Sequence, residues 1–191
     1  MKLSFVRRRR THARQLVVSL KRSEVLSTRK LRWHMMHAHQ NLLTCDCDAR
    51  RRRLSYDVEG LTSLRGYLKR SKVSHAAIVR MLVSMTQVEA WCMAGGNGCY
   101  QLLFDPSYVF VGTTWELHFA FLPVDEDASL IGNTPLVLLR WLSDDKVLQC
   151  SSPEATELAR RLADFVDAQD GVFSLNALRT FVREECGEEI N

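Results

Sequence analysis

Three short stretches in the first third of the chain have apolar patterns that predict β-strands. Residues 15–20 are β-prone, with Leu16, Val17 and Val18 in succession. Residues 42–47 and 54–58 alternate between apolar and polar with the period of two that is typical of strands. Between the last two, charged residues from Asp48 to Arg53 predict an exposed tip that joins an antiparallel hairpin. Residues 28–40 predict a short helix or an irregular segment.

Further along, apolar residues recur at every third or fourth position, which is typical of helices. Leu61, Leu64 and Leu68 predict a short helix. The next helix is predicted to be the longest and most apolar of the chain. Ser74 is its expected N-cap, and Gly95-Gly96 is its expected end.

The second half mixes short apolar stretches with helices. Strands are predicted over 100–104, 108–111 and 115–122, and an acidic loop over 124–132. Three further helices are predicted to begin after Thr134, Ser152 and Ser174. Strands followed by helices, rather than a regular alternation of the two, predict an α+β fold.

The length of 191 residues is typical of a single domain. We expect a basic disordered arm over 1–13, one domain over 14–185 and an acidic tail over 186–191. Within the domain, 14–58 should form a strand-rich lobe and 61–185 a mainly helical lobe.

Apolar runs stay well short of the ~18 residues that a membrane-spanning helix needs. The arginine-rich start also lacks the apolar core of a secretory signal. The six cysteines are therefore expected to be reduced thiols. We expect a cytoplasmic protein that contacts a membrane only peripherally, if at all.

The net charge of +4 hides a gradient along the chain. Residues 1–53 carry 15 Lys or Arg and three acids, whereas 54–191 carry 11 Lys or Arg and 19 acids. Two arginine runs form a candidate basic interaction surface: Arg7, Arg8, Arg9 and Arg10, and Arg50, Arg51, Arg52 and Arg53. Such runs bind anions by charge, so an acidic protein, an anionic membrane or nucleic acid could be the partner. Nucleic acid is the less favoured of these, because no recognition motif accompanies the charge.

Three histidines before the second predicted strand and two cysteines on it raise the question of a metal site. The residues are His34, His37, His39, Cys45 and Cys47. Imidazole and thiolate suit zinc, but the spacing matches no standard zinc motif. We predict no metal, no cofactor and no catalytic residue, since the chain also lacks a nucleophile elbow and a phosphate-binding glycine loop.

Residues 59–122 resemble the middle of the protein-kinase fold. The segment from Glu59 to Arg70 is similar to the hinge and the helix that follows it, and helix 75–93 stands where the main helix of the large lobe would. Residues 103–111 are similar to the catalytic loop and the next strand, with Pro106 at the proline of that loop. The segment from Trp115 to Leu122 would be the strand that leads to the magnesium motif.

The residues that carry phosphoryl transfer are missing from this resemblance. Kinases need an Asp at the substrate hydroxyl, an Asn and an Asp for magnesium, and a Lys for the phosphates. The corresponding positions here are Gln101-Leu102-Leu103, Tyr108 and Phe119-Ala120-Phe121, and neither a glycine-rich loop nor a Val-Ala-Ile-Lys segment precedes them. The resemblance therefore implies a degenerate site at Leu103, Asp105, Tyr108 and Phe119 that lacks activity. Asp105 is expected to be a turn former before Pro106.

Two bacterial families share this degenerate pattern. One is the pseudokinase domain of a type VII secretion membrane protein. The other, to which the chain is more similar, is a domain family of unknown function that usually precedes a forkhead-associated domain, near genes for tight-adherence pili or secretion. The matching segments are Met35-Met36 with Asn41-Leu42-Leu43, Tyr56 to Gly60 with Ser63-Leu64, Phe104 to Val109, and Phe119 to Pro123. The chain leaves no room for a forkhead-associated domain, so phosphothreonine recognition is not expected of it.

The sequence thus favours a kinase-like interaction or scaffold module without catalysis, serving a pilus or secretion assembly through a protein partner. A nucleic-acid-binding regulator that uses the arginine-rich N-terminal region is the alternative. A divergent nucleotide-binding enzyme is supported by fold analogy alone.

Overall fold

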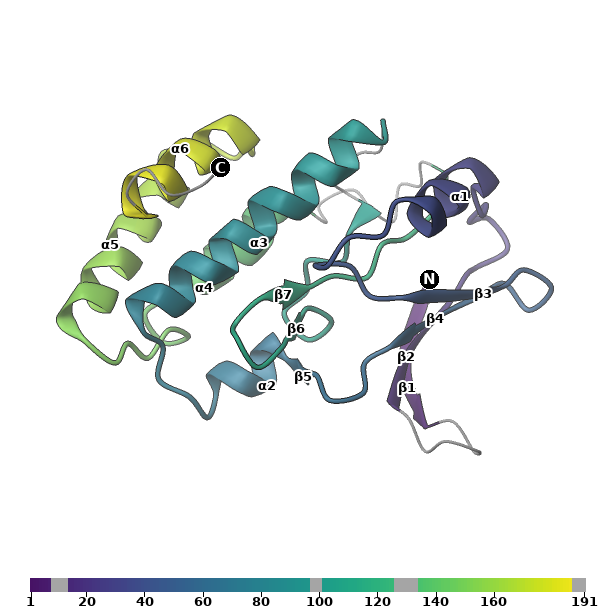
Figure 1. Ribbon diagram of the computed structural model, residues 1–191, viewed down its shortest axis with the longest axis horizontal. Coiled ribbons are helices and arrows are strands. Elements are labelled where there is room, and N and C mark those ends of the chain that lie inside the picture. Colours follow the sequence, from purple (N-terminus) through teal and green to yellow (C-terminus); the bar gives the residue numbers. More distant parts are fainter. Residues whose placement is uncertain (8–13, 97–100, 126–133, 187–191) are drawn as a thin grey trace.

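A computed structural model describes residues 1–7, 14–96, 101–125 and 134–186 of the chain. A four-stranded sheet and one helix stand at one end, and a layer of longer helices stands at the other (Figure 1). A small three-stranded sheet lies between them. The two expected lobes, one rich in strands and one mainly helical, are both present.

The larger sheet is entirely antiparallel and has the order β1-β2-β4-β3. Its strands are β1 (Lys2–Arg7), β2 (Arg14–Ser19), β3 (Cys45–Asp48) and β4 (Arg53–Asp57). The predicted hairpin is confirmed, because β3 pairs with β4 in a register that sets Asp48 opposite Arg53. Helix α1 (Thr28–Met36) connects β2 to β3, as the pattern over 28–40 predicted.

The prediction of a disordered arm is wrong for residues 2–7, which form strand β1. This strand pairs with β2 along its full length, from Lys2 opposite Ser19 to Arg7 opposite Arg14. The arginines that follow suggested a solvated arm, but Leu3 packs against buried hydrophobic residues, and the ring of Phe5, which is 41% exposed, stacks on Tyr108. Residues 8–13 lie outside the described part of the chain.

The chain leaves the sheet through residues 58–61 and enters the helical lobe. Strand β5 (Thr62–Ser63) leads into the short helix α2 (Leu64–Leu68). The predicted helix begins later than Leu61 because Thr62 pairs with Val111 of strand β6. Helix α3 (His75–Ala94) is confirmed as the longest, and the Ser74 hydroxyl accepts a hydrogen bond from its third residue, Ala77, at 3.2 Å.

The predicted strands of the second half are much shorter in the structure. Strands β6 (Phe110–Val111) and β7 (Leu117–His118) pair with each other and complete the small sheet β5-β6-β7. The remaining parts of the predicted strands form isolated bridges, such as Leu102 with Phe121. Residues 101–104 and 119–122 are buried in succession although most of them lie outside the strands. Their apolar character therefore reflects burial in the core and suggested strands longer than those that form.

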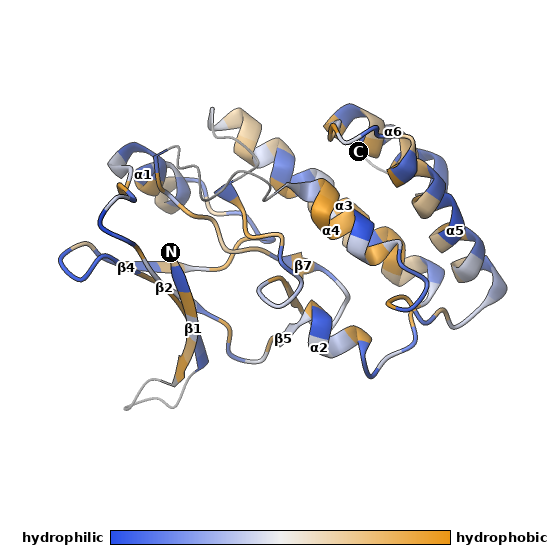
Figure 2. Ribbon diagram, turned by 180° about the vertical axis from the view of Figure 1, so that it is seen from behind, coloured by the Kyte–Doolittle hydropathy of each residue, from blue (hydrophilic) through white to orange (hydrophobic). Residues whose placement is uncertain are grey.

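Three helices complete the lobe, at the predicted places. They are α4 (Pro135–Leu142), α5 (Pro153–Asp167) and α6 (Leu175–Cys186). The Ser152 and Ser174 hydroxyls accept hydrogen bonds from the first turns of α5 and α6. Helix α3 packs against α5 and α6. Hydrophobic residues concentrate along α3 and α4, while α5 and α6 carry many hydrophilic ones (Figure 2).

Two hydrophobic clusters hold the structure together. The larger one fills the helical lobe around Met81, Met85 and Phe121. The smaller one joins the four-stranded sheet to residues 103–124. Of the helices in the described ranges, none combines the length and the apolar character needed to cross a membrane.

Candidate functional site

The degenerate site predicted from the sequence lies where the sheet meets the helical lobe. Two of its residues are core residues: Leu103 is 6% exposed and Phe119 is fully buried. The smaller hydrophobic cluster runs from the sheet into this region without interruption. Its buried members include Leu16, Val18, Leu54 and Tyr56 from the strands, and Leu103, Phe110, Ala120 and Leu122 from the helical lobe. Apolar side chains thus occupy the space between the two parts.

The segment 119–122 is held on both sides by backbone hydrogen bonds. On one side, Phe119 donates to Asn41 at 2.8 Å and accepts from Leu43 at 2.9 Å. On the other side, Ala120 accepts from Leu103 at 3.1 Å and Leu122 donates to Gln101 at 2.7 Å. This segment is therefore fixed in place, and its backbone is occupied by protein partners.

Asp105 forms a turn, as predicted. Its side chain is exposed, and its Oδ1 accepts a hydrogen bond from the Ser107 N–H at 2.8 Å. Its backbone carbonyl accepts from the N–H of Tyr108 at 2.8 Å and of Val109 at 3.1 Å. A carboxylate that satisfies the following backbone in this way is an Asx turn, a structural arrangement that needs no cation.

Tyr108, the fourth residue of the predicted site, packs against strand β1. Its ring stacks on Phe5 with the centroids 6.0 Å apart, and Phe5 meets Phe110 edge to face at 6.2 Å. The Arg14 guanidinium lies over the other side of this group, 4.4 Å from the Phe5 ring centre. Strand β1 therefore covers part of Tyr108 and Phe110, a contact that the sequence did not predict.

A buried lysine also reaches this region and was missed from the sequence. Lys30 of α1 is 7% exposed, and its ammonium donates a hydrogen bond to the Val124 carbonyl at 2.9 Å. The Gln101 amide donates to the same oxygen at 2.9 Å. The available signal was the helical spacing of Lys30, Leu31 and His34, but lysines on short helices are usually solvated.

His34 is another buried polar residue of α1. Its ring stacks on Phe121 with the centroids 5.4 Å apart and meets Trp91 edge to face at 6.0 Å. Burial lowers the pKa of His34, so the ring is neutral near pH 7. His37 instead stacks on Trp33, with ring centroids 3.6 Å apart.

Within the described residues, no three His, Cys, Asp or Glu side chains come together in a group that could hold a metal ion. Burial raises the pKa of Cys45 to about 12 and also raises that of Cys47. Metal-binding cysteines must lose their protons, so neither thiol is prepared for that role.

Glu89 of α3 is a second buried charge that the sequence did not flag. It is 1% exposed, and burial raises its pKa to about 8. One carboxyl oxygen has no hydrogen-bond partner in the protein. The side chain is therefore largely protonated at neutral pH, which makes it tolerable within the helical lobe.

The four arginines of the hairpin divide into two groups. Arg50, Arg51 and Arg53 are exposed and remain available for a partner. Arg52 lies at φ 54°, and one terminal nitrogen of its guanidinium donates to the backbone carbonyls of residues 21, 22 and 24. Arg52 is thus engaged within the protein in a way that sequence reasoning missed, and the prediction of a basic interaction surface stays a prediction. Of the other run, Arg7 ends β1, and Arg8, Arg9 and Arg10 lie outside the described residues.

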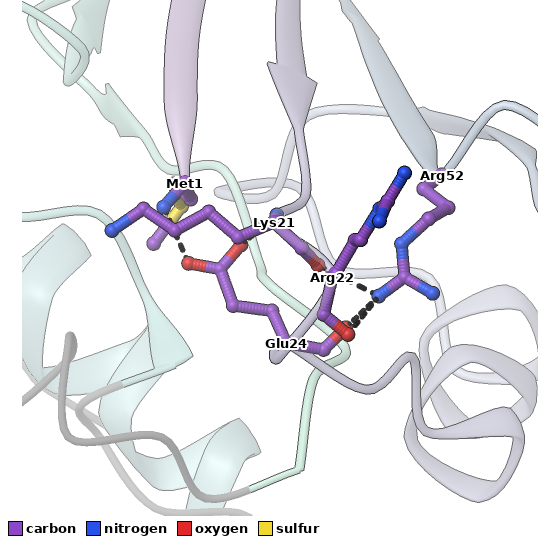
Figure 3. A network of polar contacts seen from close by, with 5 residues as sticks. All are labelled: Met1, Lys21, Arg22, Glu24 and Arg52. Carbon is purple, nitrogen blue, oxygen red and sulfur yellow. Dashed lines mark hydrogen bonds and ion pairs between the residues drawn. The ribbon is translucent and has the colours of Figure 1, made fainter.

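Figure 3 shows how Arg52 belongs to a compact polar network. The Glu24 carboxylate, 2% exposed, pairs with the Met1 ammonium and accepts a hydrogen bond from the Lys21 N–H at 2.6 Å. Arg52 binds the carbonyl groups of the same loop from the opposite side. The network attaches the loop after β2 to both the hairpin and the start of the chain.

We compared the chain with family models, with curated proteins and with solved structures. No family model matches the chain, and no curated protein matches it. Among solved structures, a co-crystal of the pseudokinase DRIK1 (drought responsive inactive kinase 1) bound to ENMD-2076 has a TM-score of 0.53 at 12% identity, over 92% of this chain and 84% of that one. The apo GRMZM2G135359 pseudokinase has a TM-score of 0.46 at 14% identity, over 94% of this chain and 78% of that one. The chain has a kinase-like fold.

The kinase-like fold confirms the predicted architecture. In the alignment expected from the sequence, the segment at the catalytic loop begins with Gln101 and Leu102, and both are completely buried. In the same alignment, Tyr108 would stand at the magnesium-binding asparagine and Phe119-Ala120-Phe121 at the magnesium motif. Phosphoryl transfer relies on oxygen ligands that place magnesium at the phosphates, and apolar side chains cannot supply them.

Proposed function

We propose that this kinase-like protein is a non-catalytic interaction module, with a protein as its main partner. The observation that supports the proposal most strongly is the continuous apolar packing of Leu103, Phe110 and Ala120 against the strands. A nucleotide would have to displace these side chains before it could reach the segments that correspond to the kinase site. The role in a bacterial pilus or secretion assembly rests on the sequence resemblance alone.

The absence of catalysis can be tested by an assay of ATP turnover. Purified protein at micromolar concentration is incubated with ATP and magnesium, and released phosphate and transferred phosphate are both measured. We expect no turnover above that of a matched sample of the Phe119→Ala variant. Turnover by the unaltered protein that this variant loses would contradict the proposal.

The exposed arginines of the hairpin are the proposed attachment point for an acidic partner protein or, more peripherally, an anionic membrane. Arg50 and Arg51 lie at the tip and Arg53 begins β4; all three are exposed. The Arg51 guanidinium forms a long, exposed ion pair with Asp48 at 3.7 Å. Exposed pairs of this kind contribute little, so the positive charge remains available to a partner.

The alternative function, nucleic-acid binding, is favoured by the same exposed arginines. Charge-driven binding to DNA would be steeply salt dependent and indifferent to sequence. The test compares the unaltered chain with Arg50→Glu/Arg51→Glu/Arg53→Glu on a short duplex at physiological salt. A matched control reverses Lys69, Arg70 and Lys72, which are equally exposed. Tight binding that only the hairpin variant loses would support the alternative; the main proposal expects no such binding.

A further inference from the structure

A cleft of about 520 Å³ lies between α3, α6 and the loop after α1, on a part of the molecule that the degenerate kinase-like site does not include. Its lining residues are His39, Gln40, Thr86, Gln87, Ala90, Arg179, Val182 and Arg183. None of them is acidic. The lining includes the apolar side chains of Ala90 and Val182, together with side chains from three elements that carry nitrogen donors.

Two arginines of α6 supply the positive charge. Arg179 and Arg183 are four residues apart, so they lie one above the other on the same side of the helix. Both are exposed, and neither forms an ion pair with any residue in the described part of the chain. Guanidinium groups without a carboxylate partner are suited to bind an anion through paired N–H donors.

His39 contributes a donor of defined direction. Its Nδ1 accepts a hydrogen bond from the Asn41 backbone N–H at 3.1 Å. Burial lowers the pKa of His39, so the ring is neutral near pH 7 and its proton is on Nε2. The backbone thus fixes the tautomer that leaves Nε2–H as the free donor.

Gln87 of α3 also offers a hydrogen-bond donor to the cleft. Its carbonyl oxygen accepts a long hydrogen bond from the Gln40 amide at 3.5 Å. This contact orients the Gln87 side chain and leaves its NH₂ group as a donor. The cleft therefore gathers four donor groups, from the loop, α3 and α6.

The acidic residues of the same elements do not oppose an anion here. Glu89, the acid of α3, is absent from the lining and largely protonated near neutral pH. Glu185 of α6 is directed elsewhere, because it pairs with Arg161 at 2.7 Å and lies 3.9 Å from His75. Glu184 is exposed and is also absent from the lining.

We propose that this cleft binds a phosphate group, through Arg179 and Arg183 on one side and His39 and Gln87 on the other. A carboxylate has two oxygens, and a single guanidinium can satisfy both. A phosphate presents three or four oxygens, which matches donors that arrive from three elements. The group could come from free phosphate or from a phosphate monoester, and the two share this recognition chemistry.

The test is a titration with inorganic phosphate, with O-phosphoserine and with acetate, at constant ionic strength, followed by ¹H–¹⁵N NMR. We expect saturable shifts of the Asn41 amide and of the Arg179 and Arg183 Nε–H signals with both phosphates, and none with acetate. Tighter binding of O-phosphoserine would assign the site to monoesters, and tighter binding of inorganic phosphate would assign it to the free ion.

The variant Arg179→Gln/Arg183→Gln should weaken phosphate binding about tenfold or more, since each guanidinium provides charge-assisted hydrogen bonds. Lys69→Gln/Arg70→Gln removes the same charge from another exposed site and should leave binding unchanged. All four side chains are exposed, so neither variant should unfold. Equal losses in the two variants, equal binding of acetate, or shifts that never saturate would each overturn the proposal.

Discussion

The Tyr56 hydroxyl donates a hydrogen bond to the Phe121 carbonyl oxygen at 2.5 Å, although 65 residues separate the two in the chain. Tyr56 belongs to β4, one of the two inner strands of the larger sheet, and Phe121 lies in the segment that the sequence resemblance aligns with the magnesium motif of kinases. Both side chains are fully buried. The bond therefore joins the four-stranded sheet to the segment 119–122 of the helical lobe.

The first prediction concerns this bond. Tyr56→Phe removes the donor and leaves a buried carbonyl without it, so the free energy of unfolding should fall by about 1–3 kcal/mol. Urea denaturation measures the change. Tyr108→Phe is the control, because that half-exposed tyrosine donates no hydrogen bond to a described residue, and it should lose less than about 0.5 kcal/mol. Equal losses would show that the bond contributes nothing.

The second prediction concerns the Asp105 turn. Asp105→Asn keeps an oxygen that can accept from the Ser107 N–H, and its stability should match that of the unaltered chain. Asp105→Ala loses this acceptor and should cost about 1 kcal/mol. Thermal denaturation of both variants, with and without magnesium, tests the point. A magnesium effect that Asp105→Asn abolishes would mean that the carboxylate holds a cation.

The third prediction follows from the raised pKa of Glu89, about 8. In the unfolded chain the carboxyl ionises near its ordinary pKa of 4.5. Above that pH the unfolded state is favoured by ionisation, whereas the folded state keeps its proton until about pH 8. Stability should therefore decline as the pH rises from about 4.5 to about 8.

Glu89→Gln removes this titration. The variant should melt at a higher temperature than the unaltered chain at pH 8, and the difference should shrink at pH 5. Glu184→Gln, at an exposed position of α6, is the control and should leave the pH profile unchanged. A difference for Glu89→Gln that stays constant from pH 5 to pH 8 would contradict the burial of an unpaired carboxyl.

The fourth prediction separates two neighbours in the arginine run. Arg52→Ala loses hydrogen bonds to the carbonyl groups of the loop after β2 and should cost about 2 kcal/mol. Arg51→Ala loses one exposed contact with Asp48 and should stay within about 0.5 kcal/mol. Chemical denaturation of the two variants compares them directly, and similar costs would refute a distinct structural role for Arg52.

The sequence predicted the starts of three helices and one hairpin, because residues close in the chain determine where these elements begin and turn. Ser74, Ser152 and Ser174 each cap a helix at the predicted residue, because the capping hydroxyl bonds to a backbone N–H three residues later. The β3–β4 hairpin followed from alternation around a charged tip. The sequence also predicts that kinase ligands are missing, because apolar residues stand at the positions that the resemblance aligns with them; this stays a prediction.

Contacts between distant segments account for what the sequence did not reveal. Strand β1 was hidden by the arginines after it, and its Phe5 stacks on Tyr108, which is about a hundred residues away in the chain. Arg52 is one of four consecutive arginines, and the sequence does not distinguish it from the others. Its structural role comes from hydrogen bonds to the loop after β2, which lies about thirty residues earlier in the chain. The burial of Lys30 and Glu89 likewise depends on which helix faces pack together. Because charged residues are usually exposed, the sequence did not predict that these two would be buried.

The central claim is that apolar packing fills the place of the kinase nucleotide site. The most direct measurement is the melting temperature with and without millimolar ATP, each with and without magnesium. The account predicts no shift. A nucleotide at 100 times its dissociation constant would stabilise the fold by about 2.7 kcal/mol, which is a rise of several degrees for a chain of this size. A rise of that magnitude would contradict the account, because it would require an open and occupied site between the lobes.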